Sequence, residues 1–127
     1  MIVYDSSAIL AVLREEVGAA LVIGQTELGM ISAINLGEVA HVQLRFGKTR
    51  AEAEDVIREM GIPIVDVDAQ LALDAAEIKI IGKEAGLSQA DCICLALAKR
   101  EGAVALTGDR DWLKIADAIG VEVRMIR

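Results

Sequence analysis

Apolar residues along this chain fall into two patterns, short continuous runs and longer segments with helical spacing. Continuous apolar runs are typical of buried parallel strands, and they predict five strands, at residues 1–4, 30–32, 62–67, 103–106 and 121–126. Apolar residues three or four positions apart predict helices over residues 8–14, 17–28, 33–45, 49–60, 68–84, 88–100 and 112–118. Because strands and helices alternate, the pattern predicts an α/β fold, with a central parallel β-sheet of about five strands flanked by helices on both faces.

Local signals support this division of the chain. Thr49 and Glu52 have the spacing of a helix capping box, and Gly61 and Pro63 end the helix that follows. No internal repeat, low-complexity tract or linker interrupts the alternation. We therefore expect a single domain over residues 1–127, a length sufficient to bury a substantial core.

Composition narrows the class of protein. Apolar residues make up 54% of the 127 positions but aromatic residues only 2%, so aliphatic side chains must fill the core. The most apolar long stretch, residues 17–36, is interrupted by Gln25, Thr26 and Glu27, which argues against a transmembrane helix. The N-terminus has no basic segment followed by an apolar one. We therefore expect a cytoplasmic protein with no membrane span.

The two cysteines carry no clear chemistry. Cys92 and Cys94 are two residues apart, so on one helix their side chains would point roughly 200° apart, which argues against a disulfide. Together with a single histidine they are too few to build a zinc site. We interpret them as small buried apolar residues.

The net charge of −7 by itself argues against nucleic-acid binding, because contacts to phosphates require Lys and Arg. The charge does not exclude such binding, however. A bound cation can neutralise clustered acids, and a dimer can concentrate its few basic residues on one surface.

Acidic residues follow two of the predicted strands. Asp5 comes one residue after the first strand and Asp109 three residues after the fourth. In open α/β sheets ligands bind beyond the carboxyl ends of the strands, so these two acids share a site if their strands are neighbours. Each also has a purely structural explanation, because an aspartate at either position can cap a helix or complete a turn.

Two further acids lie on predicted helices. Asp91 interrupts an otherwise apolar segment, which indicates a buried helix, although with Ser88 it also has the spacing of a capping box. Glu38 forms a polar stripe with His41 and Arg45, and it either faces a site or pairs with Arg45 at the surface. The preceding residue, Gly37, would allow close approach to the backbone.

Four carboxylates in one crevice would repel each other. Two unit charges about 5 Å apart cost roughly 3 kcal/mol at an effective dielectric constant near 20. Either some of the acids are protonated or a divalent cation lies among them, and ligation by oxygen alone suits Mg²⁺ or Mn²⁺. Such an ion activates water and stabilises phosphoryl displacement, so the pattern indicates metal-dependent hydrolysis of a phosphodiester.

Four segments in order resemble the PIN domain family, and in particular VapC-type toxins of bacterial type II toxin–antitoxin systems. They are I-V-Y-D-S-S-A-I-L-A, I-S-A-I-N-L-G-E-V-A, L-S-Q-A-D-C-I-C-L-A-L-A and A-L-T-G-D-R-D-W-L followed by G-V-E-V, and they span essentially the whole chain. The resemblance implies a PIN-like fold and a Mg²⁺- or Mn²⁺-dependent endoribonuclease that stops translation. It also implies a homodimer that a cognate antitoxin holds inactive, with a higher assembly of the two as a further expectation.

The resemblance assigns roles by motif. It implies catalytic and metal-binding roles for Asp5, Glu38, Asp91 and Asp109, with Glu38 acting directly or through water. Asp111 is a fifth acid that either caps a helix or binds the metal through water. The remaining candidates are two supporting residues that hydrogen-bond the acids, Ser6 and Thr107, and four basic residues that would contact RNA, Arg45, Lys48, Arg50 and Arg110.

Three neighbouring positions are given structural roles. Trp112 stands where the family usually has Phe, and we expect it to anchor its helix in the core. Gly108 replaces another small residue. We interpret His41 as a helix-face or dimer-surface residue, with RNA contact as the alternative.

Other functions fit less well. A response-regulator receiver domain needs paired acids after the first strand, and a haloacid-dehalogenase-type phosphatase needs D-x-D, whereas this chain has D-S-S at that point. A PIN scaffold that has lost activity and only binds protein or RNA is the main alternative, and the complete set of four acids argues against it. On the helix over residues 49–60, the apolar residues are either dimer contacts or core, namely Ala53, Val56, Ile57 and Met60.

Overall fold

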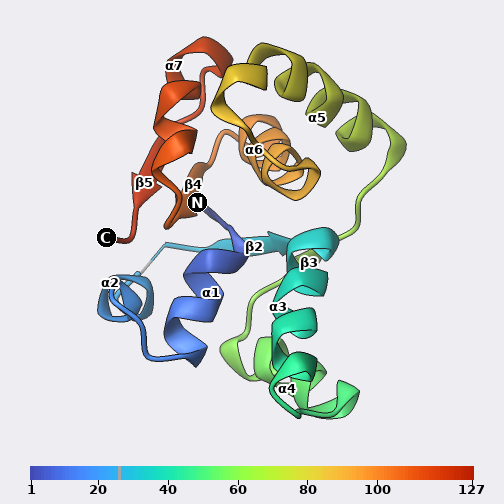
Figure 1. The fold of residues 1–127 in the computed structure, drawn as a ribbon, viewed down its shortest axis with the longest axis vertical. Helices are drawn as coiled ribbons and strands as arrows, with labels where there is room; N and C mark the ends of the chain where they lie inside the picture. The colour runs from blue at the N-terminus through green and yellow to red at the C-terminus, as the bar shows by residue number, and fades with distance from the viewer. Residues whose placement is uncertain (26) are drawn as a thin grey trace.

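The computed structural model describes residues 1–25 and 27–127, and within them one parallel sheet lies between two layers of helices (Figure 1). The five strands of the described residues pair in the order β3-β2-β1-β4-β5. This confirms the predicted α/β fold with a parallel central sheet. The strands are β1 (Ile2–Tyr4), β2 (Gly29–Ser32), β3 (Ile64–Val65), β4 (Val104–Thr107) and β5 (Val123–Met125).

The helices divide between the two faces of the sheet (Figure 1). On one face lie α1 (Ser6–Leu13), α2 (Ala19–Ile23), α3 (Ala33–Arg45) and α4 (Arg50–Met60). On the other lie α5 (Ala69–Ile81), α6 (Gln89–Glu101) and α7 (Ala116–Ile119), with the short 3₁₀ helices η1 (Lys83–Ala85) and η2 (Arg110–Lys114).

Alternation along the central strands creates two separate cores. Val3 and Ala105 point toward the α5–α6 face, whereas Ile2, Tyr4 and Leu106 point toward the α1–α3 face. All five side chains are buried. Since β1 is covered on both faces, its continuous apolar sequence follows from its place at the centre of the sheet.

The order of the strands reverses beside β1. The chain forms β1, β2 and β3 in one direction, and then crosses through α5 and α6 to place β4 on the other side of β1. The amide of Asp5 donates to the carbonyl of Leu106 (3.0 Å), so the ends of β1 and β4 lie together. Such a reversal opens a crevice at the carboxyl ends of the strands. The order also differs from the 2-1-3-4-5 order of receiver domains, which excludes that alternative.

Four predicted elements differ from the structure. The helix expected over residues 68–84 ends as α5 at Ile81, and the 3₁₀ helix η1 follows it. The helix expected over residues 17–28 is reduced to α2, which begins after Gly18, its N-cap residue with a positive φ (101°), and ends at Gly24; residue 26 of that prediction lies outside the described residues. The strand expected over residues 62–67 is the two-residue β3, at a sheet edge just after Pro63, which has no amide hydrogen to donate. The helix expected over residues 112–118 is split into η2 and α7.

Other predictions hold. The capping box of Thr49 and Glu52 is present, and Cys92 and Cys94 are buried free thiols. In the described part of the chain no helix combines the length and apolarity needed to cross a membrane. Of the apolar residues on α4, Ala53 and Ile57 are buried within the chain itself, so for these two the core interpretation is correct.

Two glycines provide a test of the packing around β2 and α3. A Cβ at Gly29 would lie 2.2 Å from Cε2 of Tyr4, whereas a Cβ at Gly37 would meet nothing within 4 Å in the described part of the chain. We predict that Gly29→Ala destabilises the protein by roughly 1–3 kcal/mol and that Gly37→Ala stabilises it by about 0.5–1 kcal/mol, because alanine is the better helix former. Urea denaturation measures both, and equal effects would contradict the packing described.

Candidate acidic site

Asp5 does not cap α1 with its side chain. Its backbone occupies the N-cap position, but its carboxylate makes no capping hydrogen bond and is almost fully buried, at 4% exposure. It instead accepts hydrogen bonds from the hydroxyls of Thr107 (2.8 Å) and Ser7. The capping explanation for this side chain is therefore wrong, and the carboxylate points into the junction of β1 and β4.

Two hydroxyl groups join the strand ends around Asp5. The amide of Gly108 donates to Oγ of Ser7 (2.9 Å), and the amide of Asp109 donates to Oγ1 of Thr107 (3.1 Å). Ser7 was not singled out from the sequence. The D-S-S sequence after β1 is the only signal that could have found it, because its partner Gly108 is about 100 residues away.

Glu38 lies on α3 with its carboxylate directed at the same junction. Its Oε1 accepts from Oγ of Ser6 (2.9 Å) and from Nδ2 of the Asn35 side chain (3.0 Å). Among the described residues it forms no ion pair with Arg45, so the surface-pair explanation is wrong. Asn35 is fully buried, and no role was predicted for it from the sequence. Its position three residues before Glu38 nevertheless places both side chains on one face of the helix.

Asp91 and Asp109 both cap helices. Asp91 forms the expected capping box with Ser88, and the carboxylate of Asp109 accepts from the amide of Asp111 (2.9 Å). In each case only one carboxylate oxygen is used within the described residues. The structural explanations are therefore correct, and they leave the second oxygen of each aspartate available.

Burial and the neighbouring acids raise the pKa of two of the carboxyl groups, those of Asp5 and Asp91. Burial, together with the charges of Asp91 and Glu38, raises the pKa of Asp5 from its usual 3.8 to about 6, although the hydrogen bonds from Ser7 and Thr107 lower it. The pKa of Asp91 is also raised, first by burial and then by the charges of Asp109 and Glu38. All four carboxylates therefore share one electrostatic environment.

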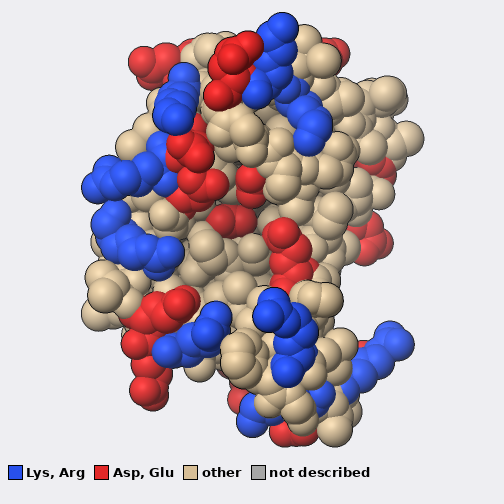
Figure 2. Space-filling view, in the orientation of Figure 1, with Lys and Arg blue, Asp and Glu red and all other residues tan. Residues whose placement is uncertain are grey.

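This environment contains little positive charge. None of the ion pairs found in residues 1–25 and 27–127 involves Asp5, Glu38, Asp91 or Asp109. Figure 2 shows acidic side chains around a central depression, with Lys and Arg side chains on its rim. Uncompensated carboxylate oxygens fit a hard divalent cation. The described residues nevertheless hold no group of three His, Cys, Asp or Glu side chains arranged around a common point.

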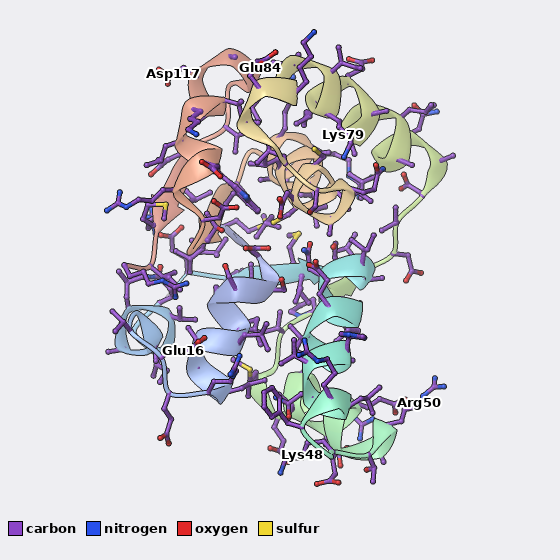
Figure 3. All side chains as sticks on the ribbon, viewed as in Figure 1. Glu16, Lys48, Arg50, Lys79, Glu84 and Asp117 are labelled. Carbon is purple, nitrogen blue, oxygen red and sulfur yellow. The ribbon has the colours of Figure 1, made fainter. Side chains whose placement is uncertain are left out.

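The expected basic residues do not gather at the acids. Lys48 and Arg50 lie at the α3–α4 turn, away from the strand ends, and Arg50 pairs with Glu54 (3.0 Å) (Figure 3). Arg45 is exposed at the end of α3 that leads to this turn. Of the four candidates only Arg110 is next in sequence to one of the four acids, and it is exposed there.

Further residues lie near Gly108, at the end of β4 beside the acidic site. Asp111 forms an ion pair with Lys114 (2.8 Å). Trp112 is fully buried, as expected for an anchor of its helix. The guanidinium of Arg127 lies against Gly108, where a Cβ would come within 2.7 Å of Nη2. Arg127 is therefore a cation beside the strand ends that the sequence did not indicate.

Comparison with known proteins identifies similar folds. A family model described as PIN domain matches residues 2–118. A toxin–antitoxin complex from Klebsiella pneumoniae is 16% identical with a TM-score of 0.77, covering 100% of this chain and 98% of that one. FitAcB from Neisseria gonorrhoeae is 24% identical with a TM-score of 0.70, covering 97% and 96%.

A third similar structure is VapC20 from Mycobacterium tuberculosis, described as a toxin that cleaves the sarcin–ricin loop. It is 21% identical with a TM-score of 0.74, covering 90% of this chain and 94% of that one. At these identities the likeness shows the fold. A search of curated proteins gave no significant match.

The buried charge of Asp5 predicts a pH-dependent stability difference between the wild type and Asp5→Asn without metal. A pKa raised from 3.8 to about 6 on folding destabilises the folded state above about pH 6, and this penalty disappears below about pH 4. We therefore predict that Asp5→Asn gains up to about 3 kcal/mol relative to the wild type as the pH rises through this range. Denaturation in EDTA measures the difference, and a constant difference would contradict the burial of a charged Asp5.

Proposed function

The chain belongs to the PIN domain family, and we propose that it is a Mg²⁺- or Mn²⁺-dependent endoribonuclease, the toxin of a toxin–antitoxin pair. One observation carries the proposal: four carboxylates without cationic partners in the described residues interact where the strand order reverses. Their mutual repulsion makes the site receptive to a divalent cation, and hydrolysis of an RNA phosphodiester is the chemistry that such a site supports.

The donor set fits the ion by its chemistry. Asp5, Asp91 and Asp109 would hold it directly or through water, with Asp111 as a further contact through water. Mg²⁺ commonly binds one or two carboxylates and keeps several waters, so a site without three converging side chains remains suitable. When bound, the ion supplies a Lewis acid for the phosphate and lowers the pKa of a water molecule.

The protein contributes orientation and a base. Thr107 and Ser7 fix one carboxylate oxygen of Asp5. Ser6 and Asn35 both donate to Oε1 of Glu38, which leaves Oε2 free of hydrogen bonds within the described residues. Glu38 would orient or deprotonate the attacking water, since a general base needs a free oxygen held in a fixed position.

Positive charge for the RNA backbone would come from the rim of the site. Arg110 follows Asp109 in the chain, and Arg127 lies against Gly108. Arg45, Lys48 and Arg50 lie farther along α3 and at the α3–α4 turn, where they would contact a more distant part of the RNA. Cleavage of RNA would inhibit translation.

We also propose a cognate antitoxin, because several of the similar structures are complexes of a toxin with its antitoxin. The proposal includes a homodimer that joins the antitoxin in a higher assembly. An apolar groove of about 900 Å³ between α3 and α4 suits the apolar face of such a partner. Leu44, 49% exposed, lies on its wall, and Ala53 and Ile57 form buried parts of its lining.

A PIN scaffold without activity is the alternative. It would bind RNA or protein through the same surfaces without needing four carboxylates in one crevice. The raised pKa values of Asp5 and Asp91 mean that these carboxylates, when charged and without a cation, lower the stability of the fold. A scaffold that only binds a partner does not need these destabilising groups, so they favour the catalytic interpretation.

The test is RNA cleavage by the wild type, Asp5→Asn and Asp117→Asn. Asp117 is exposed on α7, away from the strand ends, and receives the same chemical change (Figure 3). We predict that Asp5→Asn loses at least about 100-fold in cleavage rate, because it removes a charged ligand, whereas Asp117→Asn cleaves like the wild type. EDTA should abolish cleavage and Mn²⁺ restore it.

Metal binding provides a second measurement on the same proteins. Mg²⁺ should raise the melting temperature of the wild type and of Asp117→Asn, but not of Asp5→Asn, because a ligand that binds only the folded state stabilises it. Cleavage that survives in Asp5→Asn would indicate a contaminating nuclease or a different site. A wild type that neither cleaves RNA nor responds to Mg²⁺ would favour the inactive scaffold.

A further inference from the structure

A second recess opens beside the acidic site, between α1 and α3. It has a volume of about 520 Å³, and Ser6 and Glu38 line it. These two side chains are hydrogen-bonded to each other (2.9 Å) and belong to the acidic site as well. The recess, which we call the α1–α3 cleft, is therefore continuous with the place where the scissile phosphate would lie.

The walls of the α1–α3 cleft are apolar. Leu10 of α1 and Ile34 and Val42 of α3 line it, and all three are only half-buried. No lysine or arginine is among the described residues of the lining, so the cleft offers no partner for a phosphate. A flat, uncharged and largely apolar group fits these walls better.

One aromatic side chain borders the cleft. His41 follows Glu38 by three residues, on the same side of α3, and is exposed. It makes no hydrogen bond or ion pair within the described residues. The other aromatic side chains are placed elsewhere: Tyr4 and Trp112 are buried, and Phe46 lies 4.9 Å from the guanidinium of Arg14.

We propose that the α1–α3 cleft binds one nucleobase of the RNA substrate, next to the scissile phosphate, with the ring of His41 stacked on it. This rests on the proposed ribonuclease function and makes His41 a residue that positions the substrate. Proteins that recognise single-stranded RNA hold unstacked bases against aromatic rings and apolar walls. The base carries no charge, so it can enter a recess beside carboxylates that would repel a phosphate.

The test compares His41→Ala, His41→Phe and Gln43→Ala. Gln43 is on the same helix but lines a different recess, with Lys48 and Glu52, and serves as the control. Binding of a short fluorescein-labelled single-stranded RNA is measured by anisotropy in EDTA, where cleavage is suppressed. We expect His41→Ala to weaken binding roughly 5- to 100-fold, and His41→Phe to remain within about threefold of the wild type, because a phenyl ring also stacks.

Substrates with one missing base locate the contact. In Mg²⁺, His41→Ala should raise KM much more than it lowers kcat. An abasic substitution at one position beside the mapped cleavage site should raise KM similarly for the wild type. At that position the two changes should not add, because each removes the same stacking contact.

Several results would overturn the cleft assignment. They are unchanged RNA binding in His41→Ala, binding by His41→Phe as weak as by His41→Ala, and full additivity at every abasic position. If His41→Ala lost binding to a partner protein but kept its binding to RNA, the cleft would be assigned to a protein instead. Wild type that binds RNA through His41 but does not cleave it would contradict the proposed activity while leaving the cleft assignment in place.

Discussion

The carboxylate of Asp5 is buried where β1 meets β4, and its hydrogen-bond partners are hydroxyl groups rather than cations. Its position follows from the sheet, because β1 is central and the strand order reverses on one side of it. Every other part of the site is arranged around this group. Thr107 and Ser7 donate hydrogen bonds to it, and the charge of Asp91 raises its pKa. Ser6, the next residue in the chain, donates a hydrogen bond to Glu38.

The carboxylate that the proposed function requires also lowers the stability of the folded protein. A carboxylate with a raised pKa is destabilising when it is charged, and a small domain has only about 5–15 kcal/mol of net stability. The two aliphatic cores on either face of the sheet must supply the compensation. A divalent cation would make the electrostatic environment of the Asp5 carboxylate attractive instead of repulsive, because an opposite charge favours the ionised form. Binding of such an ion would therefore stabilise the folded protein.

The sequence could predict those features that depend on local patterns. The helix over residues 33–45 has the bounds of α3, because its apolar spacing and the Ser32 cap both lie in the local sequence. The choice of Asp5, Glu38, Asp91 and Asp109 rests on motif order, and all but Glu38 also lie just after a strand or at the start of a helix; their catalytic roles stay a prediction. The helix predicted over residues 17–28 was too long, because apolar spacing alone did not reveal that α2 begins after Gly18 and ends at Gly24.

What the sequence could not predict depends on contacts between distant segments. Ser7 and Arg127 matter because each contacts Gly108, and Asn35 because its side chain holds Glu38. The basic residues were predicted from their charge alone, which does not reveal where a side chain lies in the fold. Lys48 and Arg50 lie at the α3–α4 turn, away from the acids. Hydrogen bonding and the location of charge require the assembled fold.

The titration of Asp5 tests the central claim most directly. Carbon-detected NMR of the carboxyl group, compared with Asp5→Asn for assignment, gives its pKa in EDTA and in Mg²⁺. The structure predicts a midpoint near pH 6 without metal, because burial and the neighbouring acids disfavour the charge, and a midpoint well below that when Mg²⁺ is present. A midpoint near the usual 3.8 in EDTA, or one that Mg²⁺ leaves unchanged, would contradict a buried acidic site built to hold a cation.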